Sequence, residues 1–154
     1  MKKFITQLHK IYNRKTLPNE ESFVETITTV NTVLSFEESD IRPRDKHGLC
    51  GGVIKLNKDM TTIIVSDLHA RVGFIKKLLE FKISKVSVLD LLFQNKIQIV
   101  CVGDAFHSEG RAKKRWLLAN EEFKGGYQKH RHMDKEMVEN LNLIELIFLL
   151  KTKF

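Results

Sequence analysis

The chain has 154 residues, 42% of them hydrophobic, which is enough for one globular domain with a buried core and too few for two ordinary domains. Its 26 Lys and Arg residues outnumber its 19 Asp and Glu residues, for a formal net charge of +7, but the charges are spread along the chain. Two cysteines are too few for a disulfide scaffold, and no apolar tract approaches the roughly 20 residues of a membrane span.

These features favour a protein of the reducing cytoplasm without a membrane segment. Cys101 lies in the apolar run 99–102, which suits a buried thiol. The basic start at residues 1–3 is followed by neither a continuous apolar stretch nor a small-residue cleavage site, so no signal peptide is expected. The positive charge allows an anionic partner, but net charge bears more on solubility than on a specific function, and nucleic acid is the less favoured partner.

The first third of the chain carries weak structural signals. Residues 1–20 mix Lys, Asn and Thr with Pro18 and could form a flexible amino-terminal extension. Residues 22–36 alternate apolar side chains with Thr and Glu, a pattern that fits a helix or a short strand. Residues 37–52 are charged, contain Pro43 and close with several glycines, which predicts a loop.

The middle of the chain predicts a strand followed by a helix. Residues 53–56 and 61–65 are rich in β-branched side chains and flank a turn-forming segment at 57–59, which indicates a β-hairpin. Apolar residues then recur at spacings of three and four, which predicts an amphipathic helix over 72–82. This order of elements predicts a β-to-α step at Ser66–Asp67.

The second half predicts another strand between helices. Residues 86–93 are apolar enough for a short helix, and 96–102 form a near-continuous apolar run typical of a buried parallel strand. Ser108 can cap the next helix, for which Gly125 is a stop signal. A last helix is expected at 133–150 from its apolar spacing.

This order predicts a single α/β domain over 1–154, with at least two parallel strands joined by a right-handed crossover. Parallel sheets normally contain more strands, and the chain stops directly after a helix. We therefore expect an incomplete fold that lacks the carboxyl-terminal half of its sheet. Self-association or a missing carboxyl-terminal segment would complete it.

Two short motifs follow the two predicted parallel strands. Asp67 and His69 are two residues apart, so in extended backbone they point the same way and offer one oxygen and one nitrogen to an ion. Asp104 enters from the next strand, after Gly103. Each motif alone reads as ordinary turn chemistry, but ligands of open α/β sheets bind at the carboxyl ends of strands. The combination predicts a metal site at Asp67, His69 and Asp104.

The segments 66–71 (Ser-Asp-Leu-His-Ala-Arg) and 103–111 (Gly-Asp-Ala-Phe-His-Ser-Glu-Gly-Arg) resemble the first two signatures of calcineurin-like metallophosphoesterases, which include serine/threonine protein phosphatases and diadenosine tetraphosphatases. The resemblance implies the α/β sandwich of that family and a metal-dependent phosphoesterase, in which hydroxide shared by two divalent ions (Mn, Fe or Zn) attacks a phosphomonoester or phosphodiester. It implies that Asp67 and His69 hold one metal and that Asp104 bridges both. The partner would be a phosphorylated substrate.

Three further residues are weaker candidates. The protein-phosphatase branch has Gly-Asp-x-x-Asp-Arg-Gly with its Arg on phosphate, whereas here Arg111 follows the glycine. Arg111 and Arg71 are candidate phosphate contacts, although Arg71 also reads as an exposed residue of a first helical turn. His107 is a candidate partner for a carboxylate or a metal-bound water, or an ordinary loop residue.

The resemblance stops before the signatures that complete the family's site. The chain contains no Gly-Asn-His, and His130-Arg131-His132 reads as a solvated segment. The general acid is therefore unknown, and we expect little or no turnover by this chain alone. The alternatives are a noncatalytic remnant that binds metal or a protein partner, and a basic nucleic-acid-binding domain.

Overall fold

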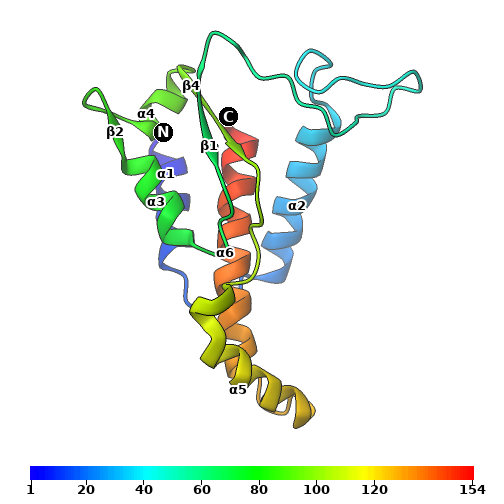
Figure 1. Cartoon of the computed structure of the whole chain (residues 1–154), viewed down its shortest axis with the longest axis vertical. Coiled ribbons are helices and arrows are strands. Elements are labelled where there is room, and N and C mark those ends of the chain that lie inside the picture. Colours follow the sequence, from blue (N-terminus) through cyan, green and yellow to red (C-terminus); the bar gives the residue numbers. More distant parts are fainter.

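The chain is a mixed α/β protein in which helices lie behind and to both sides of a small two-stranded parallel sheet (Figure 1). The computed structural model describes residues 1–154. The helices are α1 (Lys2–Asn13), α2 (Glu20–Ser35), α3 (Val72–Glu80), α4 (Val88–Phe93), α5 (Lys113–Lys124) and α6 (Arg131–Lys153), with a short 3-10 helix η1 (Glu109–Ala112) before α5. The strands are β1 (Thr61–Val65), β2 (Lys82–Ile83), β3 (Val86–Ser87) and β4 (Ile97–Cys101). None of the helices combines the length and the apolar character that crossing a membrane requires.

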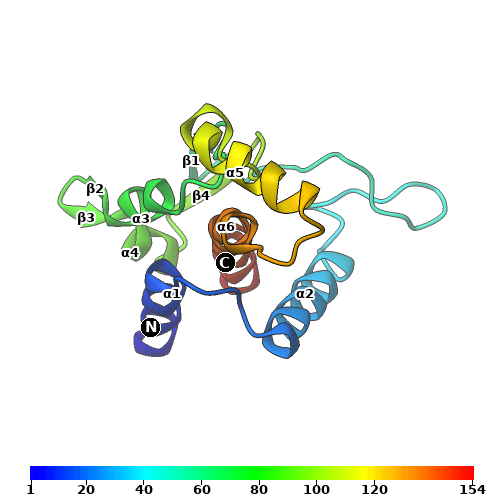
Figure 2. The same ribbon diagram turned by 90° about the horizontal axis from the view of Figure 1, so that it is seen from below.

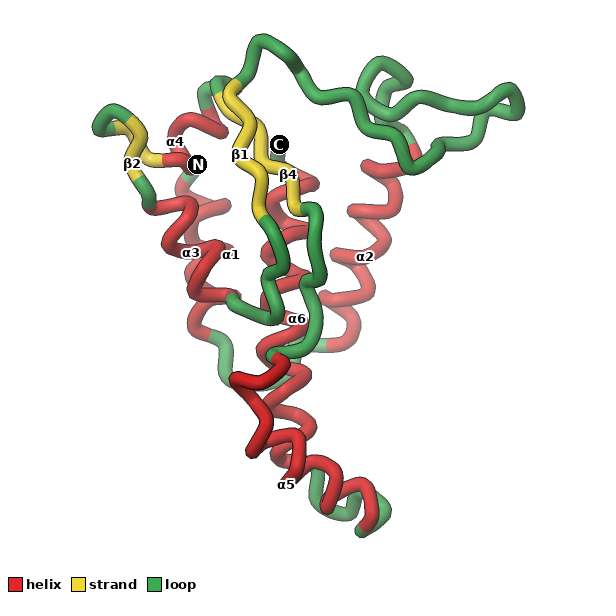
Figure 3. The backbone as a smooth tube through the Cα atoms, viewed as in Figure 1, coloured by secondary structure: helices red, strands yellow, loops and turns green.

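The main sheet consists of β1 and β4, which run parallel and side by side (Figure 3). Their register pairs Thr61 with Ile97 and Val65 with Cys101, so both strands end at the same edge. Helices α3 and α4 connect them, and β2 and β3 form a separate two-residue antiparallel ladder. The predicted parallel strands and the helix between them are therefore confirmed.

The predicted β-hairpin is wrong. Residues 53–56 form no strand and lie in the long loop that joins α2 to β1, with Val53 and Ile54 63% and 59% exposed. The strand β1 instead pairs in parallel with β4, from Thr61 opposite Ile97 to Val65 opposite Cys101. The preceding segment 37–52 is a loop as predicted, closed by a single bridge between Arg44 and Cys50.

The amino terminus is a packed helix and not a flexible extension. Phe4, Leu8 and Ile11 follow each other at spacings of four and three, so they share one face of α1, and all three are buried. The ring of Phe4 packs edge-on against Phe93 and Phe154, at 5.6 Å between centroids in each case. The alternation of apolar and polar residues over this stretch has a helical period, which the mixed composition obscured.

Residues 22–36, for which the sequence allowed either a helix or a short strand, lie almost entirely in the helix α2. Asn19 caps this helix, because its side chain accepts a hydrogen bond from the N–H of Ser22. Such a cap satisfies one of the free N–H groups at a helix start and is worth about 1 kcal/mol. The cap therefore decides between the two alternatives that periodicity could not separate.

The helix α6 forms the centre of the molecule (Figure 2). It contacts α1, α2, α3 and α5, and its residues Leu143 and Leu146 are completely buried. The core cluster joins these to side chains of α1, α3, α4 and both parallel strands. Cys101, expected to be buried, is exposed, because burial along β4 decreases from Ile97 to Cys101 at the end of the strand.

Candidate metal centre

The loops that follow β1 and β4 are bonded to each other through their backbones. The N–H groups of Leu68 and His69 both donate to the carbonyl of Asp104, at 2.7 and 3.0 Å, and the N–H of Ala70 donates to Ala105 at 2.9 Å. Because β1 and β4 are parallel and end side by side, the loops that follow them can also form hydrogen bonds with each other. It brings the two sequence motifs together.

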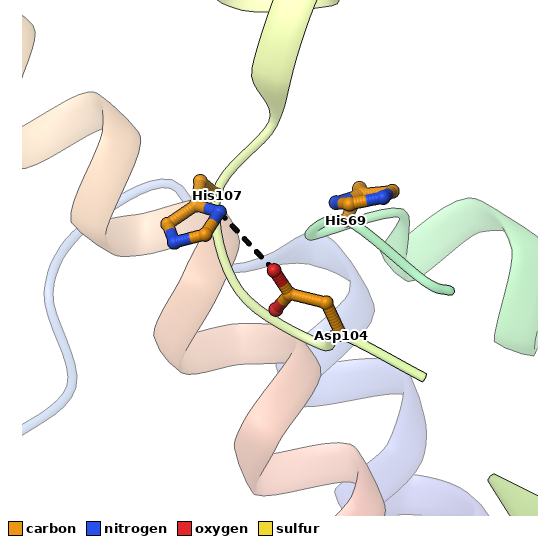
Figure 4. Close-up of side chains that lie close together, drawn as sticks. All are labelled: His69, Asp104 and His107. Carbon is orange, nitrogen blue, oxygen red and sulfur yellow. Dashed lines mark ion pairs between the residues drawn. The ribbon is translucent and has the colours of Figure 1, made fainter. Parts of the chain in front are cut away.

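The closest group of metal-ligating side chains consists of His69, Asp104 and His107 (Figure 4). One ligand atom from each lies within 4.8 Å of the other two. The Nδ1 atom of His107 lies 3.3 Å from Oδ2 of Asp104. Two imidazoles and one carboxylate form a donor set that suits divalent Zn, Mn or Fe. His107, a weaker candidate from the sequence, is thus part of the group.

Asp67 lies beside this group without belonging to it. Its Oδ1 accepts the backbone N–H of Asp104 at 3.0 Å, and its Oδ2 lies 3.8 Å from Nε2 of His69. One carboxylate oxygen therefore joins the two loops, and the other is free to face a cation. The two carboxylate oxygens of Asp104 likewise have different partners. Its Oδ1 accepts a hydrogen bond from the N–H of Phe106 at 2.7 Å, and its Oδ2 faces His107.

The His69 side chain is the most enclosed donor of the site, 13% exposed. Its Nδ1 is buried without a hydrogen-bond partner, and its Nε2 lies 3.5 Å from Oε1 of Glu109. A buried polar atom left unpaired costs about 1–3 kcal/mol, a cost that a ligand at this ring can remove. The residues therefore fit a divalent cation. Glu109 was not among the sequence candidates, although it lies inside the second motif.

Several site residues adopt left-handed backbone conformations that non-glycine residues rarely use. The φ angles are 44° at His69, 56° at Ala70, 36° at His107 and 46° at Glu109. Such conformations cost about 1–3 kcal/mol each and persist where the surroundings hold them, often at functional sites. Contacts from elsewhere in the fold must therefore fix these loops.

A buried polar network on α6 and α5 supplies those contacts. The N–H of His107 donates to Oδ1 of Asn140 at 2.6 Å, and the N–H and hydroxyl of Ser108 donate to Oε1 of Glu136 at 3.0 and 2.8 Å. Arg115 donates in turn to Oε2 of Glu136 at 2.8 Å. Ser108 therefore does not cap the following helix with its side chain, as the sequence suggested, because its hydroxyl bonds to Glu136.

Glu136 and Asn140 were not among the residues predicted from the sequence. Glu136 and Asn140 are four apart, and this spacing places them on one face of α6. No local signal shows that this face meets the loop after β4, since the partners are 28 and 33 residues away in sequence.

The network lowers the pKa values of two acids, Glu136 and Glu139, which both accept hydrogen bonds from Arg115. Burial by itself would raise the pKa of Glu136, but hydrogen bonds from Ser108 and the pairing with Arg115 outweigh it and hold that pKa below the ordinary value of 4.5. Burial likewise opposes ionisation of Glu139, and Arg115 and Arg111 lower its pKa below the same value.

We therefore expect stability to fall in acid. Since both folded pKa values lie below the unfolded value of about 4.5, the pairs stabilise the fold fully above that pH and lose this contribution as the pH falls through the folded pKa values. The urea midpoint, measured from neutral pH downward, should be flat above that value and decline below it. The variant Glu136→Gln should show a shallower decline, and an equally steep one would contradict this assignment.

Both arginine candidates lie beside the metal group and play different parts. Arg111 Nη1 pairs with Oε2 of Glu139 at 3.0 Å, and Nη2 donates to the carbonyl of His69 at 3.3 Å. Arg111 therefore links the His69 loop to Glu139 on α6. Arg71 precedes α3, is exposed and forms no ion pair. Both line one cleft with Ala70.

The histidines of the segment 130–132, which the sequence analysis interpreted as solvated, are not part of the site. The turn from α5 into α6 forms the end of the molecule away from β1 and β4 (Figure 1). His130 directly precedes α6 and His132 lies in its first turn. Their Nδ1 atoms each lie 2.7 Å from a carboxylate, Asp134 for His130 and Glu122 for His132. Both imidazoles thus have carboxylate partners, and the side chain of His130 is also exposed to solvent.

Comparison with protein-family models, with curated proteins and with solved structures found no match. The feature that bears on function is a cluster of oxygen and nitrogen donors at the ends of two parallel strands, with an arginine-lined cleft next to it.

Proposed function

We propose that this chain is a metal-dependent phosphoesterase domain of the calcineurin-like α/β sandwich type, which hydrolyses phosphomonoesters or phosphodiesters. The observation that carries the proposal is the group of His69, Asp104 and His107 at the ends of two adjacent parallel strands, with Asp67 bonded to Asp104. These residues include all three that the resemblance to that family implies as metal ligands.

The residues divide the work of such a site. His69, Asp104 and His107 would hold a divalent cation, which when bound neutralises phosphoryl oxygens and lowers the pKa of water. Asp67 holds the two loops together and keeps one oxygen facing His69. Arg111 fixes the His69 loop through its carbonyl, and Arg71 is free to receive a phosphate oxygen.

A specific observation favours a second candidate, metal binding without turnover. Phosphoester hydrolysis gains from a proton donor at the leaving group. His130 and His132 are engaged with carboxylates of α5 and α6, so His107 is the histidine left to donate a proton at its free Nε2. If His107 is needed as a ligand, the site lacks an acid.

The first experiment measures metal binding and hydrolysis together. Manganese and zinc affinity is determined by calorimetry, and release of p-nitrophenol from p-nitrophenyl phosphate and its bis-ester is followed with each metal. We expect Asp104→Asn to weaken metal binding by about 100-fold, since it removes a charged ligand. Asp59→Asn, an equal change in an exposed turn, should leave binding unchanged.

The results separate the candidates. Hydrolysis that requires metal and is lost in Asp104→Asn supports the phosphoesterase, and preference for one of the two esters identifies the bond type. Metal binding without hydrolysis of either ester supports the second candidate. A chain that binds neither metal contradicts both.

A further inference from the structure

A basic cleft of about 820 Å³ opens where the end of α1, the start of α3 and the first turns of α6 meet. Seven of its eighteen lining residues are Lys or Arg, and two are acidic. The basic residues come from four parts of the chain: Arg14, Lys15, Arg71, Lys77, Arg111, Arg131 and Lys135. The cleft is thus built from elements that only the tertiary fold brings together.

Most of this positive charge is uncompensated. Arg14 pairs with Glu145 at 2.6 Å and Arg111 with Glu139, but no carboxylate lies within ion-pair distance of the other five. The two acids of the cleft are already engaged, Glu139 by arginines and Asp134 by His130. The cations without an ion pair are all exposed: Lys15, Arg71, Lys77, Arg131 and Lys135. They are available to a ligand.

The uncharged parts of the wall also suit a phosphorylated ligand. The first turn of α3, residues 72–74, lines the cleft, and the positive end of a helix dipole favours anions. The phenol of Tyr12 is a neutral group of the wall and adds no negative charge. Phe74 presents a ring that is 47% exposed.

We propose that this cleft binds a compact ligand containing a chain of linked phosphates, either free or attached to a nucleoside. Several cations around one hollow match several phosphates within one small molecule, since each phosphate can take charge-assisted hydrogen bonds. The volume lies in the range of about 300–1,000 Å³ that small-ligand sites occupy. An extended nucleic-acid strand would call for a basic groove that continues along the surface.

The proposed site adjoins the metal centre, with which it shares Arg71 and Arg111, and does not depend on a bound metal. Ala70 and Arg111 lie between the two, since Arg111 lines the cleft and donates to the carbonyl of His69. None of His69, Asp104 and His107 lines the cleft. The ligand should therefore bind in the presence of a metal chelator, and Asp104→Asn should bind it normally.

The test is calorimetric titration of the full chain with sodium tripolyphosphate and with ATP, in EDTA. The double variant Arg131→Ala with Lys135→Ala removes two free cations four residues apart on α6. The matched control, Lys46→Ala with Lys58→Ala, makes the same charge change in the long loop before β1. We expect about tenfold weaker binding in the first and near-unchanged binding in the second. All four residues are exposed, and thermal melting checks that both variants fold.

A comparison of the two ligands identifies the source of the phosphates. Tighter binding of ATP than of tripolyphosphate, lost in Phe74→Ala, would show a nucleoside-linked ligand, because an exposed ring can stack on a base. Equal affinity for ATP and tripolyphosphate would show that the cleft binds the phosphate chain and makes no use of the nucleoside.

Three results would overturn the proposal. The first is no binding of either ligand by the unmodified chain. The second is equal weakening in both double variants, which would mean attraction by net charge alone. The third is an oligothymidylate that binds more tightly than ATP and displaces it, which would assign the cleft to nucleic acid.

Discussion

Replacement of Gly103 by alanine is expected to destabilise the fold by about 3 kcal/mol or more and to abolish metal binding. A Cβ at this position would lie 1.7 Å from Oδ1 of Asp67, 2.5 Å from its backbone nitrogen and 2.7 Å from its Cα. Two of these are backbone atoms, which cannot move aside by rotating a side chain. The two loops of the metal centre would therefore have to separate, and the hydrogen bond from Asp104 N–H to Asp67 would break.

A second glycine provides the control for this prediction. Gly73 lies in the first turn of α3, and a Cβ there meets nothing within 4 Å. Gly73→Ala should therefore be neutral or stabilise by about 0.5–1 kcal/mol. Both variants are compared by urea unfolding and by manganese titration. A Gly103→Ala protein of normal stability that binds metal would show that the loops after β1 and β4 do not approach as described.

Replacement of Arg115 by methionine is expected to destabilise the chain by about 3–5 kcal/mol. The change leaves the carboxylate of Glu136 buried, with its side chain 4% exposed, and removes the main charge that compensates it. Glu139 also loses a partner, since Arg115 Nη1 donates a hydrogen bond to its Oε1 at 2.8 Å. The loop of His107 and Ser108 then loses its fixed acceptors, so metal affinity should decrease as well.

The adjacent Lys114→Met provides the matched control for Arg115. Lys114 is exposed on the same helix and forms no ion pair, so its replacement should change the free energy of unfolding by less than about 0.5 kcal/mol. Urea unfolding of both variants measures the difference. Equal stability of the two would contradict a role for Arg115 in holding the loop. Partial recovery of stability in Arg115→Met with Glu136→Gln, which removes the charge and keeps an acceptor for Ser108, would confirm that the unpaired charge is the cause.

Much of the local structure follows from short-range patterns. The helices at 72–80, 113–124 and 131–153 and the strands at 61–65 and 97–101 lie where apolar spacing, stop signals and a continuous apolar run predicted them. The placement of Asp67 and His69 after one strand and Asp104 after the next likewise came from the sequence. Periodicity and strand ends are properties of neighbouring residues, so they can be read locally.

The errors arose where a segment had to choose a distant partner. Residues 53–56 have β-forming side chains, but β1 pairs with β4, 36 residues further on, and no local rule ranks those alternatives. The helix α1 was missed because its apolar spacing is short and mixed with polar residues, and its buried face is completed by distant side chains, among them the rings of Phe93 and Phe154 that pack against Phe4. Propensity is a weak guide in such places because tertiary packing overrides it.

The sequence by itself determined the order of the parallel strands and the donors that follow them, because both depend on runs of adjacent residues. Tertiary structure decided the composition of the site: it drew His107 towards Asp104, held the loops with Glu136 and Asn140, and gathered unpaired cations from α1, α3 and α6 around one cleft. Contacts across so many intervening residues depend on how helices pack around α6. The free energy that fixes them comes from burial of the whole core, to which no single segment contributes enough to be recognised alone.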